Sequence, residues 1–189
     1  MTGRGGMCSP VAATSVCEGE LPLMARPIPS PLEDHARDIT GTALQATLVD
    51  LVDLALVAKQ AHWNLVGRQF HDVHLHLDEL VDTARKYSDQ VAERAAAIGV
   101  SPDGRAATIT ADSRVPDIES GWLKDRDVIR TAYEALDATV KGLRPRIEEV
   151  EKADLVTQDL FIEITGVLEE QRWMWQAQNV GYETDQPAG

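Results

Sequence analysis

The sequence is poor in cysteine and aromatic residues and contains no long apolar run. Its two cysteines, Cys8 and Cys17, both fall within the first twenty of 189 residues, so a disulfide framework is excluded as the source of a stable core. No stretch reaches the ~20 consecutive apolar residues that a membrane span needs. The N-terminus also lacks the basic start and following apolar run of a secretory signal. These absences predict a cytoplasmic protein that does not contact a membrane.

Basic residues are scarce relative to acidic ones. The chain has 18 Lys and Arg against 31 Asp and Glu, which gives a formal net charge of −13. Such a surface repels nucleic-acid phosphates unless a local basic patch compensates, and it attracts cations. The N-terminal segment up to Arg37 offers no such patch, because its three arginines are outnumbered by four acidic residues. The charge therefore does not favour DNA binding.

Composition divides the chain into three segments. Residues 1–36 are rich in Gly, Pro, Ser and Ala, which predicts a flexible tail that cannot form a helix. Residues 37–181 show helical apolar periodicity with a long connection at 99–116, and residues 182–189 form a short acidic tail. We predict an all-α four-helix bundle, with Gly142 and Pro145 interrupting its third helix. The predicted helices span 40–66, 69–98, 117–152 and 157–180.

The chemically distinctive stretch begins at His62 and ends at Arg94. It holds four of the five histidines, followed by carboxylates, and no thiolate accompanies them. Neutral imidazole with carboxylate is the ligand set expected for iron, zinc or manganese. The candidate metal ligands are His62, His74, Asp78, Asp89 and Glu93, whereas we expect His71 and His76 to be ordinary surface histidines.

Gly67 separates His62 from the other four candidates, which the spacing places in two half-sites on the following helix. His74 and Asp78 are four residues apart, as are Asp89 and Glu93, so each pair shares a helical face. The two pairs point the same way, because Asp78 and Asp89 are eleven residues, or about three turns, apart. Their centres lie roughly 22 Å apart at ~1.5 Å per residue. One ion with bonds of about 2 Å cannot bridge them.

Two arrangements fit this separation. The pairs are either unrelated, or a second copy of the helix runs antiparallel across a two-fold axis and brings each pair opposite the other pair of its partner. We hypothesise the second arrangement, because isologous dimers are the commonest symmetric assembly. The axis would pass near the small residues Thr83 and Ala84, with Asp82 and Arg85 forming a salt bridge across it. An apolar stripe at helical spacing should face the subunit's own core: Val73, Leu77, Leu80, Val81, Ala84, Val91, Ala92 and Ala95.

These residues also carry a family resemblance. The pattern HWN-x-x-G-x-x-F-x-x-x-H-x-x-x-D, followed by D-x-x-A-E-R, resembles the signature of the Dps (DNA protection during starvation) proteins, the miniferritins of the ferritin-like superfamily. The resemblance implies a ferritin-like four-helix bundle with a short extra helix near 106–113, assembled into a dodecamer from two-fold dimers. It also implies that His62, His74 and Asp78 come from one subunit and that Asp89 and Glu93 come from its two-fold mate.

The resemblance further implies a ferroxidase, an oxidoreductase acting on metal ions. Each intersubunit site would take two Fe(II) ions, with hydrogen peroxide expected as the oxidant and oxygen as the alternative, and the ferric product would be stored as mineral in the central cavity. Trp63 would lie near the metal and supply an electron during oxidation, whereas Trp173 and Trp175 are expected to serve core and interface packing. Acidic residues near the start of the fourth long helix would line three-fold pores for iron entry: Asp154, Asp159 and Glu163.

Three other functions compete with this interpretation. A full ferritin needs Glu-x-x-His on two helices, and no Glu-x-x-His occurs in the sequence. A nucleoid-associated protein whose main role is binding DNA is the principal alternative, although the acidic charge argues against it. A structural shell that holds zinc in place of iron is the third.

Overall fold

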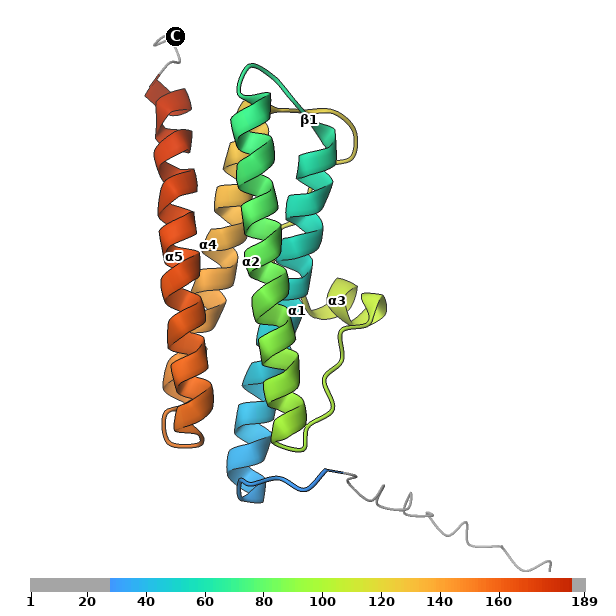
Figure 1. Ribbon diagram of the computed structural model, residues 1–189, viewed down its shortest axis with the longest axis vertical. Helices are drawn as coiled ribbons and strands as arrows, with labels where there is room; N and C mark the ends of the chain where they lie inside the picture. The colour runs from blue at the N-terminus through green and yellow to red at the C-terminus, as the bar shows by residue number, and fades with distance from the viewer. Residues whose placement is uncertain (1–27, 185–189) are drawn as a thin grey trace, which may run out of the picture.

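The structure, a computed structural model, describes residues 28–184, so Cys8, Cys17, most of the predicted N-terminal tail and residues 185–189 lie outside the described residues. Four long helices lie side by side along the long axis (Figure 1). A short helix, α3, lies in the crossover beside α1, which confirms the predicted all-α bundle with an extra helix. The helices are α1 (Asp34–Asn64), α2 (Phe70–Ala97), α3 (Ala106–Asp112), α4 (Asp125–Val150) and α5 (Leu155–Thr184).

The bundle is built from two antiparallel hairpins. α1 packs against α2, α4 packs against α5, and α1 joins the hairpins by also packing along α4. Among the described residues, α1 is the one helix long and apolar enough to cross a membrane, with a mean hydropathy of 1.5 over its most apolar window. Because 67% of that window is buried inside the bundle, the core accounts for its apolar residues.

The predicted apolar stripe of α2 faces this core. Seven of its eight residues are buried, and Ala92 is partly buried against them. Since α2 turns its apolar face inward, the polar residues one-third of a turn away remain on the flank of the bundle. The buried members of the stripe are Val73, Leu77, Leu80, Val81, Ala84, Val91 and Ala95.

A two-residue parallel strand pair ties the α1–α2 turn to the start of α4. Leu65 and Val66 (β1) pair with Leu123 and Lys124 (β2). Gly67 follows with φ +145°, and a β-carbon there would lie 2.4 Å from the carboxyl carbon of Asp125. The positive φ and this close approach explain why glycine separates the two helices, as predicted.

Three predicted helix features were wrong. α1 begins at Asp34, inside the segment assigned to the tail, because Arg37 is buried and its guanidinium is paired with Asp34 and Asp38. α4 begins at Asp125 instead of Asp117, because the strand pair occupies the two preceding residues. α4 also continues without interruption through Pro145.

A buried ion pair links α1 to α4. The guanidinium of Arg146 donates to Asp50 Oδ2 at 2.8 Å, and their side chains are 4% and 1% exposed. Asp50 Oδ1 also accepts the backbone N–H of Arg114, so both carboxylate oxygens are satisfied. Gly142 leaves room for this pair, because a β-carbon there would lie 3.2 Å from Asp50 Oδ2. Gly142, which was predicted to interrupt the helix, therefore allows α4 to pack closely against Asp50 of α1.

Candidate metal centre

Three predicted ligands meet where α1 ends and α2 begins. His62 lies in the last turn of α1, and His74 and Asp78 lie on successive turns of α2. One ligand atom from each side chain lies within 4.8 Å of the other two. His62 is buried, whereas His74 and Asp78 are partly exposed, so the cluster opens to the flank of the hairpin. Two imidazoles and one carboxylate fit iron, zinc or manganese, but leave coordination positions open.

The two histidines hold each other in place. Their rings stack with centroids 3.6 Å apart and planes inclined by 24°. His62 Nδ1 lies 3.1 Å from the carbonyl oxygen of His74, and His74 Nδ1 lies 3.3 Å from the carbonyl oxygen of His62. We assign the Nδ1–H tautomer to both rings, because only a protonated nitrogen can donate to a carbonyl oxygen. Each Nε2 then keeps the lone pair that a metal ion needs.

The protonation states of the cluster suit metal binding. Burial lowers the pKa of His62, which favours the neutral imidazole that can act as a ligand. Asp78 is held ionised mainly by a hydrogen bond from Lys59, which lowers the pKa of its carboxyl group below the usual range. The two side chains are therefore in the forms that coordinate a cation.

Lys59 is a residue of this site that the sequence did not reveal. Its Nζ lies 2.6 Å from Asp78 Oδ1, so a metal ion that binds Asp78 through this oxygen must compete with the ammonium group. Lys59 precedes His62 by three residues on the same helix, which places both on one face. That spacing is the signal that could have identified it.

Asp89 and Glu93 lie apart from this cluster. Both are exposed on α2, three to four turns beyond Asp78. A straight helix separates them from Asp78 by about 16 to 22 Å, so one chain cannot bring all five candidates to one ion. The single chain thus carries a three-residue cluster and a separate carboxylate pair.

The residues midway between the half-sites have contacts within their own chain. Ala84 is fully buried in the subunit's own core, as predicted for the apolar stripe, and Thr83 Oγ1 accepts a hydrogen bond of 2.9 Å from Gln171 on α5. The position of the two-fold axis near these residues stays a prediction. Asp82 and Arg85 are the exposed residues at this level, in accord with their predicted place on the ligand face.

Large apolar side chains are exposed around the three-residue cluster. Trp63, which follows His62, is 65% exposed, and Leu56, two turns before it on α1, is 56% exposed. Phe70, whose ring stacks on that of His74 with centroids 5.0 Å apart, is 44% exposed, and Leu75, which follows His74, is 50% exposed. Exposed large apolar side chains are the kind of group that an interaction surface buries.

The remaining histidines and tryptophans divide between surface and core. His71 is exposed as predicted, whereas His76, also predicted to be an ordinary surface histidine, is half-buried because its ring stacks on Trp175 with centroids 4.1 Å apart. Trp175 is fully buried, as predicted for core packing, and Trp173 on the same helix is 63% exposed. The sequence signal for His76 is its place three residues after Val73, on the flank of the core stripe.

The three acidic residues predicted for an iron-entry pore have different environments. Asp154 is buried, pairs with Arg94 and caps α5 by accepting the backbone N–H of Thr157. Burial alone would raise the pKa of Asp154, but hydrogen bonds from Thr157 and Arg94 outweigh it and lower the pKa. Asp159 is exposed, and so is Glu163, which accepts a hydrogen bond of 3.0 Å from the Tyr87 hydroxyl.

Comparison with known proteins gives a consistent set of matches. The model of the ferritin-like domain family matches residues 41–181. DNA protection during starvation protein 2 of Deinococcus radiodurans is 38% identical over 135 residues, which cover 71% of this chain and 56% of that protein. The DNA protection during starvation protein of Mycolicibacterium smegmatis is 38% identical over 154 residues, which cover 79% of this chain and 81% of that protein. A solved Dps structure from D. radiodurans superposes with a TM-score of 0.77 at 34% identity, covering 82% of this chain and 99% of that one.

Proposed function

Because this chain belongs to the Dps family of ferritin-like proteins, we propose that it oxidises Fe(II) at its metal centre and stores the ferric product. The observation that carries the proposal is the pair of incomplete ligand sets, one where α1 meets α2 and the other farther along α2. His62, His74 and Asp78 converge but leave coordination positions open, while Asp89 and Glu93 are exposed and join no other group of potential metal ligands within residues 28–184. Each ligand set could supply the coordinating groups that the other set lacks.

We place the complete site across a two-fold subunit interface. Two antiparallel copies of α2 would set His74 and Asp78 of one subunit opposite Asp89 and Glu93 of its mate. The exposed Trp63 and the apolar side chains near it supply the kind of surface that such an interface buries. By resemblance to the family, the full assembly is a cytoplasmic dodecamer around a storage cavity.

The proposed reaction uses two Fe(II) ions and one hydrogen peroxide. Two Fe(II) supply the two electrons that H2O2 needs, and with two protons the products are two Fe(III) and two water molecules. A lone Fe(II) would supply one electron and release a hydroxyl radical. His62 and His74 bind through Nε2, and the carboxylates favour the hard Fe(III) product. Trp63, beside His62, is placed to donate an electron when only one Fe(II) is present.

The stoichiometry of this reaction tests the proposal. Adding H2O2 to the anaerobic Fe(II)-loaded protein is expected to consume about two Fe(II) per peroxide without spin-trapped hydroxyl radical. Stopped-flow absorbance at the ferric band, run in parallel with oxygen, measures the rate with each oxidant. Consumption of one Fe(II) per peroxide with radical release would contradict the proposal, and tight zinc binding without iron oxidation would favour the structural shell.

Protection of DNA does not require that this protein bind DNA. Removing Fe(II) and peroxide together prevents hydroxyl radical formation, and the net charge of −13 disfavours contact with phosphates. A gel-shift assay at low salt, with the metal ligands substituted, separates this role from the alternative of a nucleoid-binding protein. A shift that persists in those variants would support the alternative.

We assign iron entry to the exposed acidic residues Asp159 and Glu163, with Asp154 fixing the start of their helix. Replacing both by their amides is expected to slow mineral formation about three- to ten-fold at limiting Fe(II) and low salt, because a ring of carboxylates concentrates cations. The slowing should shrink as salt rises. The matched control, Glu134→Gln with Glu148→Gln, removes the same charge from exposed positions on α4. Equal slowing by both pairs would exclude a dedicated pore.

A further inference from the structure

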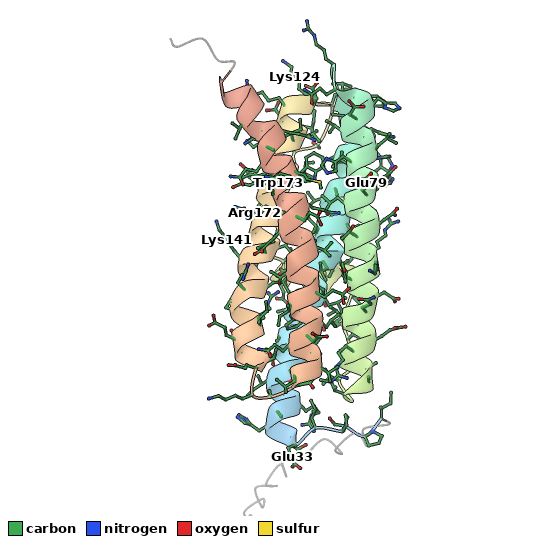
Figure 2. The ribbon with its side chains drawn as sticks, turned by 60° about the vertical axis from the view of Figure 1, so that its left-hand side comes forward. Glu33, Glu79, Lys124, Lys141, Arg172 and Trp173 are labelled. Carbon is green, nitrogen blue, oxygen red and sulfur yellow. The ribbon has the colours of Figure 1, made fainter. Side chains whose placement is uncertain are left out.

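The ligand-bearing helix α2 is held to α5 by a short series of side-chain contacts. α2 packs along most of its length on α1 but touches α5 sparsely. The two helices run antiparallel, and Figure 2 shows Glu79 of α2 and Trp173 of α5 at the same level. The contacts follow one face of each helix: His76 with Trp175, Thr83 with Gln171, Tyr87 with Glu163, and Arg94 with Thr157 and Asp154.

His76 occupies a particular place in this series. It lies two residues after His74 and two before Asp78, within the turn that carries both ligands. Two residues along a helix turn a side chain by about 200°, so His76 points away from the ligands and toward α5. His76 therefore lies on the side of α2 opposite to His74 and Asp78, on the same helical turn.

Trp175 gives His76 a rigid surface to lie on. The indole is fully buried, and the two rings are inclined by only 3° with centroids 4.1 Å apart. The Trp175 Nε1–H has no hydrogen-bond partner among the described residues, so the indole is held by its packing in the core and by the stack with His76. Gln178 adds a weaker contact of 3.4 Å to His76 Nδ1.

The rotation of α2 about its own axis matters because the ligands sit far from that axis. With side chains a helix is ~10–12 Å across, so a rotation of about 20° displaces a ligand atom by about 2 Å. That displacement equals the length of a metal–ligand bond. A functional site must instead be held to about 0.5 Å by side chains that packing has locked.

We propose that the stack of His76 on Trp175 is a positioning clamp that sets the rotation of α2 and thereby orients His74 and Asp78 toward the metal ion. This inference rests on the proposed metal centre, and it adds two residues that act on the ligands without touching the metal. It makes α5, which supplies none of the five ligands, part of the structure that supports the site.

Co(II) binding to the assembled protein tests the clamp. His76→Ala and Trp175→Leu are expected to weaken Co(II) affinity by about 10- to 100-fold, the usual cost of losing a group that orients a ligand. His76→Phe, which keeps a flat ring on Trp175, should restore affinity to within about three-fold of wild type. Calorimetry gives the affinity, the visible Co(II) spectrum reports the coordination geometry, and a thermal melt of each variant reports stability.

The control is Phe161→Leu, which also removes a buried aromatic ring from α5 but lies away from the ligand turn. It should lower the melting temperature while leaving Co(II) affinity and spectrum unchanged. Unaltered Co(II) affinity in both His76→Ala and Trp175→Leu, in intact assemblies, would overturn the clamp. If wild type bound no Co(II), or bound it equally well after His74→Ala, the proposed metal centre itself would fall and the clamp with it.

Discussion

Mixed assemblies of His62→Ala and Glu93→Ala subunits are expected to oxidise Fe(II) rapidly, although neither variant does so alone. Each variant by itself should lose about 100-fold or more in initial rate, because losing a ligand costs at least as much as losing a group that only orients one. In a mixed dimer, one site carries both substitutions and the other carries neither. The intact site is built from His62 of one subunit and Glu93 of the other.

The size of the recovery can be estimated from random mixing. Half of the dimers are mixed and each has one intact site of two, so about a quarter of the wild-type rate should return. Subunits are unfolded and refolded together, and stopped-flow oxidation is measured on assemblies of verified size. The control mixes His62→Ala with His74→Ala, in which every dimer site lacks a histidine and no rate should return. Equal rates in the two mixtures would show that the site does not cross a subunit boundary.

Arg146→Met is expected to lower the free energy of unfolding by about 3–5 kcal/mol, the usual cost of leaving a buried charge without its partner. Asp50 would keep the backbone N–H of Arg114 but lose the guanidinium that neutralises it. Adding Asp50→Asn should recover much of the loss, because an amide keeps an acceptor for Arg114 without a net charge. Urea denaturation at a fixed protein concentration measures the change, since assembly makes stability concentration-dependent.

An exposed pair on the same helix provides the control. The guanidinium of Arg144, two residues before Arg146, pairs with Glu169, and the two side chains are 61% and 36% exposed. Arg144→Met should change the free energy of unfolding by less than about 1 kcal/mol, because solvent screens exposed pairs. Similar losses in the two variants would mean that burial of the Asp50–Arg146 pair carries no special cost.

Much of the fold could be predicted because its signals are local. Gly67 and the apolar stripe of α2 lie within one stretch of chain, and spacing alone placed the stripe on the core and His74 with Asp78 on one face. The start of α1 was not predicted because it depends on Arg37, a charged residue that is buried and forms two ion pairs.

The features that the sequence did not reveal join distant segments. Asp50 and Arg146 lie 96 positions apart, and no local pattern marks them as partners. The stack of His76 on Trp175 likewise depends on how α2 lies against α5. Lys59 contacts Asp78 across the α1–α2 turn; its spacing from His62 places it on the ligand-bearing face of α1, but that spacing does not identify Asp78 as its partner. Helical periodicity therefore cannot predict which polar groups pair when they are distant in the sequence.

The unbroken course of α2 has a consequence for how such a protein can change over time. One continuous helix of 28 residues carries both ligand pairs. No loop therefore lies between Asp78 and Asp89 that could absorb an inserted or deleted residue. A single insertion would turn the second carboxylate pair by about 100° and advance it by ~1.5 Å. In the proposed symmetric dimer that one insertion would misalign the two ligand pairs at both metal sites, so the site requires a fixed number of residues between Asp78 and Asp89.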